Sequence, residues 1–220
     1  MEFLKSTIGK KYLLGLAGLV WTGFVAVHMA GNLLIFAGAE AYNKYSHAIV
    51  SNKPLLYGTE IILLLAIIAH AGLGILLTIE NKKAKPQGYA VPANYSKKAR
   101  FASKTMAVHG TIILFFIIYH LITFKYGPHY SVVYDGVEMR DLHRLMIEVF
   151  ASPAYVVGYT ICLILLGVHL SHGFSSVFQS FGINHPKYNM AIRKVGWAYA
   201  IIISLGFISQ PLYFFLNEVQ

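Results

Sequence analysis

The chain has 220 residues, of which 56% are apolar and only 12% are charged, and its mean hydropathy is +0.57. This composition excludes an ordinary soluble domain and indicates an integral membrane protein. The net charge of +9 would also suit a nucleic-acid-binding protein, but the basic residues cluster at the ends of apolar runs, which membrane topology explains better. The single cysteine, Cys162, excludes an intramolecular disulfide and a four-thiolate iron–sulfur cluster, and there is no CxxCH motif for covalent haem. Any metal would therefore bind through histidine.

Five apolar stretches are long enough to cross a hydrocarbon core about 30 Å thick, which takes about 20 helical residues. The first is too long for the apolar region of a signal peptide and is therefore kept as a span. We expect one all-α transmembrane domain over residues 1–220. The predicted spans cover residues 12–38, 57–79, 105–125, 153–178 and 191–216.

Lysine and arginine are distributed unequally over the two sides that these spans define. The positive-inside rule places the more basic side in the cytoplasm, with the N-terminus inside and the C-terminus outside an inner (cytoplasmic) membrane. Residues 80–104, which include Lys97, Lys98 and Arg100, form a basic cytoplasmic loop. This loop is either a topology signal at the lipid headgroups or a docking surface for a soluble partner.

The longest loop on the other side covers residues 126–152. Its segment EMRDLHRLMIEVF, residues 138–150, has apolar residues at helical spacing. This pattern predicts a short interfacial helix.

Four spans each carry a histidine well inside the apolar region. An ionisable residue at this depth is costly and indicates a functional site. With a rise of about 1.5 Å per residue, His28 and His120 lie about 24 and 21 Å from the cytoplasmic surface. On the two spans that run inward, His70 and His169 have covered about 18 and 22 Å of the core. The first two therefore share an outer layer, and the last two share an inner layer.

Two histidines on different helices at each of two depths suit two stacked haems b, each with one imidazole on either side of its iron. The first four spans would then form a bundle around the two haems. For any one histidine, the alternative is a polar residue hydrogen-bonded to a neighbouring helix. A zinc or copper site would need three or four ligands at one depth, which the two layers do not offer.

Two further histidines lie near the cytoplasmic ends of spans. We interpret His109 and His172 as contacts of the inner haem's propionates, of a quinone or of interfacial water. His172 is also a rival axial ligand, because it follows His169 by three residues and so shares its helix face. The remaining histidines are placed in loops, where His47 could lie near the propionates of an outer haem.

Several motifs make the chain recognisable. Over nearly its whole length it resembles the single-chain cytochrome b subunit, with five spans and two haems, of succinate dehydrogenases and fumarate reductases. The motifs are VHMAGN around His28, GAEAYNKYSHA from Gly38, YGTEI and IAHAGLG in the second span, IIYHL around His120, ASPA from Ala151 and GVHLSHGFSSVFQSFGI from Gly167.

This resemblance implies axial ligands at His28, His70, His120 and His169, paired as the depths suggest. It also implies a flavoprotein and an iron–sulfur subunit on the cytoplasmic face, with electrons exchanged through the haems with a quinone, often menaquinone. Succinate would bind to another subunit. One position departs from the family: some fumarate reductases carry a glutamate two residues before the fourth-span histidine, where this chain has Gly167.

A quinone site needs hydrogen-bond donors near a span end. The outer candidates are Asn32, Glu60, Tyr42 and Glu40, each of which could equally be a cap or an interfacial anchor. The candidates for an inner site are Lys5, Ser6, His109 and His172. The rival functional class is a secondary transporter or proton-coupled membrane protein without haem. Such a protein would show an internal repeat around a midplane site, and the sequence has no convincing repeat.

Overall fold

A computed structural model of the chain describes residues 2–84 and 101–217, without the side chains of residues 4, 5 and 101–104. The expected docking residues Lys97, Lys98 and Arg100 lie outside the described residues, and so does the side chain of Lys5.

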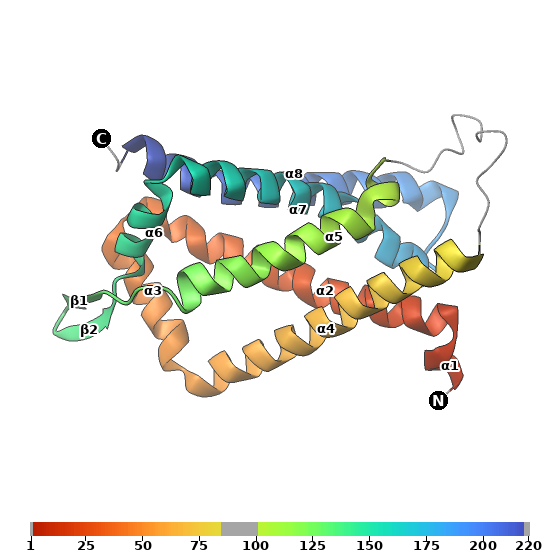
Figure 1. Cartoon of the computed structure of the whole chain (residues 1–220), viewed down its shortest axis with the longest axis horizontal. Helices are drawn as coiled ribbons and strands as arrows, with labels where there is room; N and C mark the ends of the chain where they lie inside the picture. The colour runs from red at the N-terminus through yellow and green to blue at the C-terminus, as the bar shows by residue number, and fades with distance from the viewer. Residues whose placement is uncertain (1, 85–100, 218–220) are drawn as a thin grey trace.

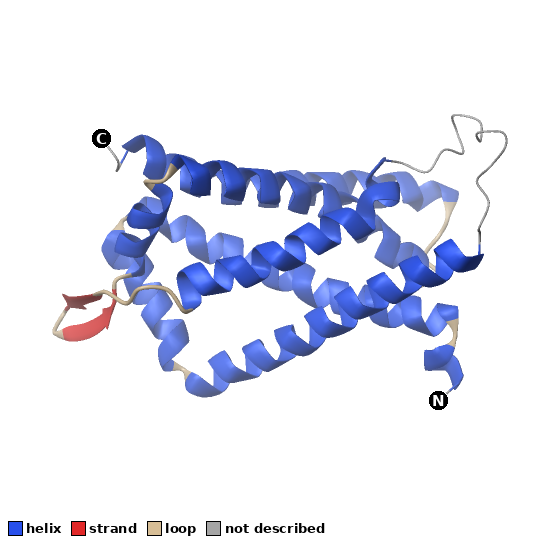
Figure 2. Cartoon of the chain, in the orientation of Figure 1, coloured by secondary structure: helices blue, strands red, loops and turns tan. Residues whose placement is uncertain are grey.

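The described chain is almost entirely helical (Figures 1 and 2). Five helical segments are long and apolar enough to cross a membrane, which indicates an all-α multi-pass membrane protein. In chain order the elements are α1 (Glu2–Lys5), α2 (Thr7–Asn32) with a 3₁₀ turn η1 (Leu33–Ala37), α3 (Ala39–Ser51), α4 (Lys53–Ala84), α5 (Phe101–His120) with a π-helical turn η3 (Leu121–Lys125), β1 (Ser131–Tyr134), β2 (Val137–Arg140), α6 (Leu142–Phe150), α7 (Pro153–Ser180) and α8 (Pro186–Asn217).

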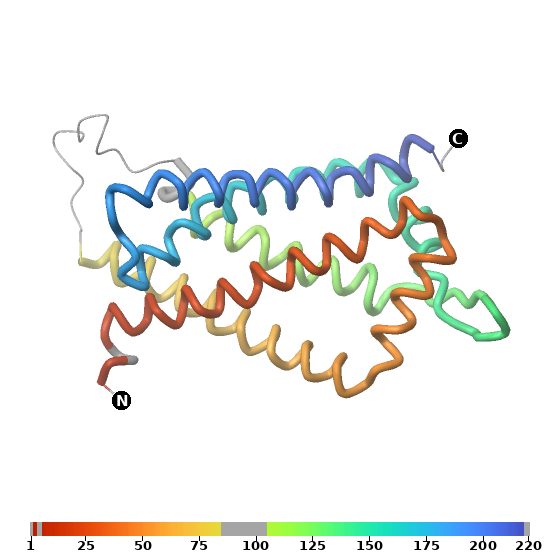
Figure 3. The backbone as a smooth tube through the Cα atoms, turned by 180° about the vertical axis from the view of Figure 1, so that it is seen from behind, coloured from red at the N-terminus to blue at the C-terminus, as the bar shows by residue number. Residues whose placement is uncertain are grey.

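The five long helices run alongside one another, and the two termini lie at opposite ends of the bundle (Figures 1 and 3). We call the end formed by α3, α6 and the two strands the hairpin end, and the other the N-terminal end. Helix α8 packs mainly along α7, while α4 diverges from its neighbours toward the hairpin end (Figure 1). The odd number of spans explains why the termini are separated.

Local sequence explains where several of these helices begin. The Ser6 hydroxyl accepts a hydrogen bond from the Gly9 amide and caps α2. Helix α7 begins at Pro153, whose missing amide hydrogen costs nothing in a first turn. At the start of α6, the Asp141 carboxylate accepts from the Arg144 amide.

The segment 126–152 differs from the expectation. Residues 138–140, predicted to begin an interfacial helix, belong instead to strand β2, which pairs antiparallel with β1. Asp135 and Gly136 connect the strands with positive φ values of 51° and 74°, as in a tight type I′ hairpin turn. The helix itself is present, but it begins only at Leu142, after the Asp141 cap.

The predicted spans are all present, and most of the helices extend beyond the predicted bounds. The first two reach residues 7–37 and 53–84, and the last begins at Pro186, because polar residues continue each helix past its apolar centre. Two histidines predicted in loops lie in helices, His47 in α3 and His143 in α6. Tyr42 and Glu40, also predicted to lie in the loop after the first span, are in α3 as well.

The best-packed part of the chain is at the hairpin end. A buried cluster there joins α3, α6, α7 and α8, and a smaller one joins α2, α7 and α8. Asn43 is fully buried in this region, where its amide donates to the Asp141 carboxylate over 2.8 Å and its carbonyl accepts from the His143 amide over 3.0 Å. These two bonds connect α3 to Asp141, which directly follows β2, and to the first turn of α6. The larger cluster consists of Ile35, Tyr42, Met146, Phe150, Val156, Tyr159, Leu163 and Phe214.

Candidate functional site

The four span histidines lie in two pairs inside the bundle. His28 of α2 faces His120 of α5, with ring centroids 5.9 Å apart. His70 of α4 faces His169 of α7, with ring centroids 6.1 Å apart. These are the partners expected from depth, and each pair joins two different helices.

The separation within each pair fits two imidazoles bound to one metal. A metal–imidazole bond is about 2.0 Å and a ring centroid lies about 1 Å from its nitrogens, so ligands on opposite faces of one metal have centroids about 6 Å apart. No group of three or more His, Cys, Asp or Glu side chains that could hold a metal occurs within residues 2–84 and 101–217. A haem needs no such group, because its porphyrin supplies the other four nitrogens and the protein supplies two.

The second nitrogen of each imidazole indicates how the ring is held. His70 Nδ1 lies 3.0 Å from the Leu14 carbonyl, which selects the tautomer that leaves Nε2 available as a ligand. His169 Nδ1 is buried and has no hydrogen-bond partner among the described residues. In the pair at the hairpin end, contacts to the rings are long: 3.5 Å from Tyr159 Oη to His120 Nδ1, and 3.4 Å from Asn32 Nδ2 to His28 Nε2. The Asn32 contact would have to be released if Nε2 of His28 bound a metal.

Two glycines bring neighbouring helices close to the rings of the second pair. A Cβ atom added at Gly18 of α2 would lie 3.0 Å from His70 Cε1, which is tighter than a normal contact. One added at Gly110 of α5 would lie 3.4 Å from His169 Cε1. A larger residue at Gly18 would press on the His70 imidazole, whereas one at Gly110 would come into van der Waals contact with His169.

The His28–His120 pair is enclosed by aromatic rings. The Phe24 ring stacks on His28 at 5.3 Å, and Phe207 lies 5.7 Å from the same imidazole. On the other side, Phe124 and Tyr159 lie 5.3 and 6.2 Å from the His120 ring. These rings shield both imidazoles from water.

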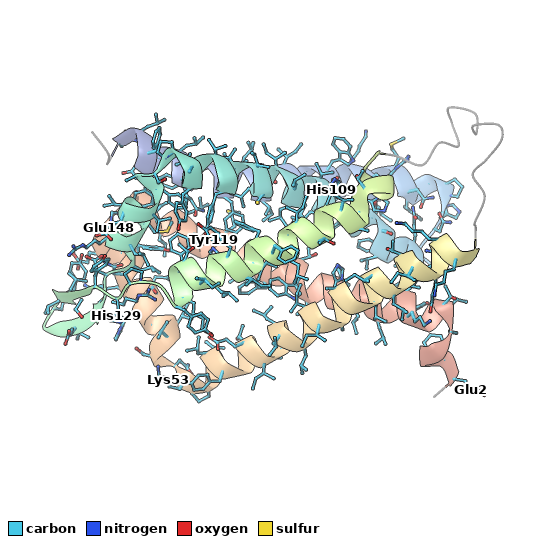
Figure 4. The ribbon with its side chains drawn as sticks, in the orientation of Figure 1. Glu2, Lys53, His109, Tyr119, His129 and Glu148 are labelled. Carbon is cyan, nitrogen blue, oxygen red and sulfur yellow. The ribbon has the colours of Figure 1, made fainter. Side chains whose placement is uncertain are left out.

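The other predicted inner residues lie on the same side of the bundle as the His70–His169 pair. His109 is buried on α5 (Figure 4), and both His109 and His172 are close enough to His169 to interact with it electrostatically. Ser6 caps α2 instead of facing this group. His172 therefore remains adjacent to the pair without being the ring that faces His70.

The outer quinone candidates separate into two groups. The Tyr42 hydroxyl donates to the Asn32 side-chain carbonyl over 2.9 Å, and Asn32 in turn contacts His28, so these residues adjoin the first pair. Burial raises the pKa of the Tyr42 hydroxyl, which keeps it protonated as a donor. Glu60 is elsewhere engaged, in an ion pair with Lys125 at 2.7 Å.

The other two predicted residues of this end make local contacts. Glu40 pairs with Lys44 one turn along α3. His47, the expected propionate contact, has its Nε2 3.1 Å from the Ser51 hydroxyl.

Sequence analysis missed Arg140, which stands at the end of β2 beside Tyr42. Nothing in the sequence singled out Arg140 beyond its being one of the few basic residues on the outer side. The Asp-Gly pair that forms the hairpin turn would have shown that this stretch folds back on the bundle.

Gly167 makes a close contact between α7 and α8. A Cβ atom there would collide with the Ser204 hydroxyl and lie 3.3 Å from Ser204 Cβ, while that hydroxyl bonds the Leu163 carbonyl. A glutamate at this position, as in some fumarate reductases, would have to displace the Ser204 hydroxyl.

Comparison with protein-family models, characterised proteins and solved structures finds no significant match for this chain. The family resemblance therefore stands on the sequence motifs, and the site stands on its own geometry.

Proposed function

We propose that the chain is the membrane-anchor cytochrome b subunit of a succinate:quinone oxidoreductase. It would hold two haems b and pass electrons between an iron–sulfur subunit and a quinone, menaquinone being the one that the family resemblance favours. The succinate site would be on the partner flavoprotein. We further propose that the N-terminal end faces the cytoplasm, where both partner subunits dock.

The observation that carries this proposal is the pair of facing imidazoles at each of two levels. Both separations, 5.9 and 6.1 Å, suit two ligands of one metal. A single facing pair could be a packing contact between helices. Two such pairs on four helices are better explained by two cofactors of the same kind. Aromatic rings surround the His28–His120 pair, and a backbone carbonyl orients His70 in the other.

The protein's own groups have distinct roles in this proposal. His70 and His169 bind one haem, and the Leu14 carbonyl orients His70. His28 and His120 bind the other between aromatic walls that keep water out. When bound, each haem supplies reversible one-electron chemistry, and its potential depends on the axial ligands and on the burial around them.

The decisive experiment is a dithionite-reduced minus oxidised visible spectrum of the purified protein, with haem quantified as the pyridine haemochromogen. We expect two haems b per chain with low-spin spectra. A colourless protein would contradict the proposal and favour the transporter.

A further inference from the structure

Among the described residues, Arg140 has no carboxylate partner of the kind that a half-buried arginine normally has. Its Nη2 donates to the Pro128 carbonyl over 2.9 Å and its Nη1 contacts the Lys125 carbonyl at 3.4 Å. The Nε–H is buried and has no partner among the described residues. Burial lowers the pKa of this guanidinium, which nevertheless stays charged, because an arginine is not deprotonated in proteins. A buried donor left without an acceptor is destabilising, so the Arg140 Nε–H is available to bind an acceptor from a ligand.

The other basic residues of the hairpin end do not share this situation. Lys44 pairs with Glu40 and Asp135, Lys125 with Glu60, and Arg144 with Glu148. Lys53 forms no ion pair with a described acidic residue, but it is exposed and solvated. Arg140 is therefore the half-buried cation of this end for which no described acidic side chain supplies the counter-charge.

The position of Arg140 relates it to the first histidine pair. The Lys125 carbonyl that it contacts is five residues beyond His120, at the end of η3, so it lies further toward the hairpin end than the His120 ring. Tyr42, which interacts electrostatically with Arg140, donates to Asn32, one turn beyond His28. Arg140 and Tyr42 are thus at the hairpin-end side of both imidazoles.

We propose that Arg140, with Tyr42 beside it, binds a carboxylate of the haem held by His28 and His120. The inference rests on the proposed function. Haem b carries two carboxylates on one edge, and an arginine fork matches a carboxylate better than any other side chain does. His47, the residue expected for this role, is instead in contact with Ser51.

The test compares haem with its dimethyl ester, which has the same iron and ring but no carboxylates. Membranes containing the full chain in haem-free form are titrated with each compound, and low-spin spectra report binding. In the wild type we expect one of the two sites to prefer haem by about tenfold or more, the effect of a charge-assisted hydrogen bond. Arg140→Gln should remove this preference and speed haem loss from half of the bound population, whereas Arg140→Lys should retain part of it.

Lys53→Gln, at an exposed cation of the same end, is the matched control and should leave the preference unchanged. Equal binding of haem and ester by the wild type would overturn the inference while leaving the proposed function intact. Equal weakening of both compounds by Arg140→Gln would also overturn it, and would mean that Arg140 only holds the hairpin in place. Loss of co-purifying anionic phospholipid from Arg140→Gln, with haem selectivity unchanged, would assign the arginine to a lipid phosphate instead. A wild-type chain that binds neither compound would contradict the proposed function and this inference together.

Discussion

The two ends of the bundle are built differently. At the hairpin end, α3 and α6 pack against the spans, and Asn43, Ile35 and Phe214 are almost completely buried. At the N-terminal end, α2 and α4 meet through a Lys10–Glu80 ion pair of 2.5 Å between partly exposed side chains. The His28–His120 pair belongs to the first region and the His70–His169 pair to the second.

This contrast suggests that the two ends of the bundle interact with different surroundings. At the N-terminal end, the Lys10–Glu80 ion pair lies near aromatic contacts such as that of Tyr12 with Phe181, and such a mixture of polar and aromatic groups suits an interface with a soluble protein. The asymmetry agrees with the proposed docking of the partner subunits at the N-terminal end.

Removing an axial imidazole should have the largest effect. His120→Ala is expected to halve the haem content and abolish one low-spin component, because one ring cannot hold the iron from both sides. The His70–His169 pair should keep its haem, still reducible by succinate in the intact complex. Pyridine haemochromogen quantitation and low-temperature spectra measure both effects.

Two controls accompany this variant. His129→Ala, at an exposed histidine of the hairpin end (Figure 4), should leave both haems in place. His172→Ala should do so too, whereas His169→Ala should remove the second haem. The opposite result for these two variants would exchange their roles.

The packing of α3 against α6 at the hairpin end should depend on Asn43. Asn43→Ala removes a hydrogen bond to the Asp141 carboxylate and leaves the His143 amide unpaired in a buried site, at a cost of about 2–4 kcal/mol. We expect a lower thermal unfolding temperature in detergent and faster proteolysis within the hairpin. Asn217→Ala is the matched control, since its amide only bonds the Tyr213 carbonyl on an exposed helix end. A stability equal to that of the wild type would show that α3 is held mainly by apolar packing.

The N-terminal end should respond to charge. Reversal of Lys97, Lys98 and Arg100 is expected to weaken recovery of the soluble subunits with the anchor. Raised ionic strength should weaken recovery with the wild-type anchor too, because exposed charges are screened by salt. Co-purification of the subunits measures this. Unchanged recovery would leave these residues with a role in topology alone.

The smallest effect is expected at Glu60. Its ion pair with Lys125 is partly exposed, so Glu60→Gln and Lys125→Gln should each change stability by about 1 kcal/mol or less. Measuring turnover of the intact complex with quinone then distinguishes a quinone-binding role of Glu60 from its role in the ion pair. Impairment in Glu60→Gln alone supports a quinone role for Glu60, while equal impairment in both variants would attribute the effect to the ion pair.

The spans and the histidine pairs could be predicted because both depend on regular helix geometry. A fixed rise per residue converts sequence position into depth, and depth alone suggested that His28 would meet His120 and that His70 would meet His169. The roles of these residues as ligands remain predictions.

The covering at the hairpin end could not be predicted in the same way. Tyr42 meets Asn32 only because α3 turns back across the end of α2, and Gly38, with φ of 103°, makes this reversal possible. Arg140 is near Tyr42 only because strand β2 packs against α3. These arrangements depend on contacts between distant segments, which periodicity does not report.

The contact between Gly167 and Ser204 has a consequence for energy conversion. Gly167 is packed on Ser204, and α7 (Pro153–Ser180) carries no acidic residue, so this helix offers no carboxylate that could move a proton alongside an electron. Under the proposed function, charge crossing the membrane would then be uncompensated at this point, and each 100 mV of membrane voltage would add or remove about 2.3 kcal/mol per charge. Electron transfer through this protein would then respond to the cell's voltage, and the direction of electron flow would decide whether the voltage assists or opposes it.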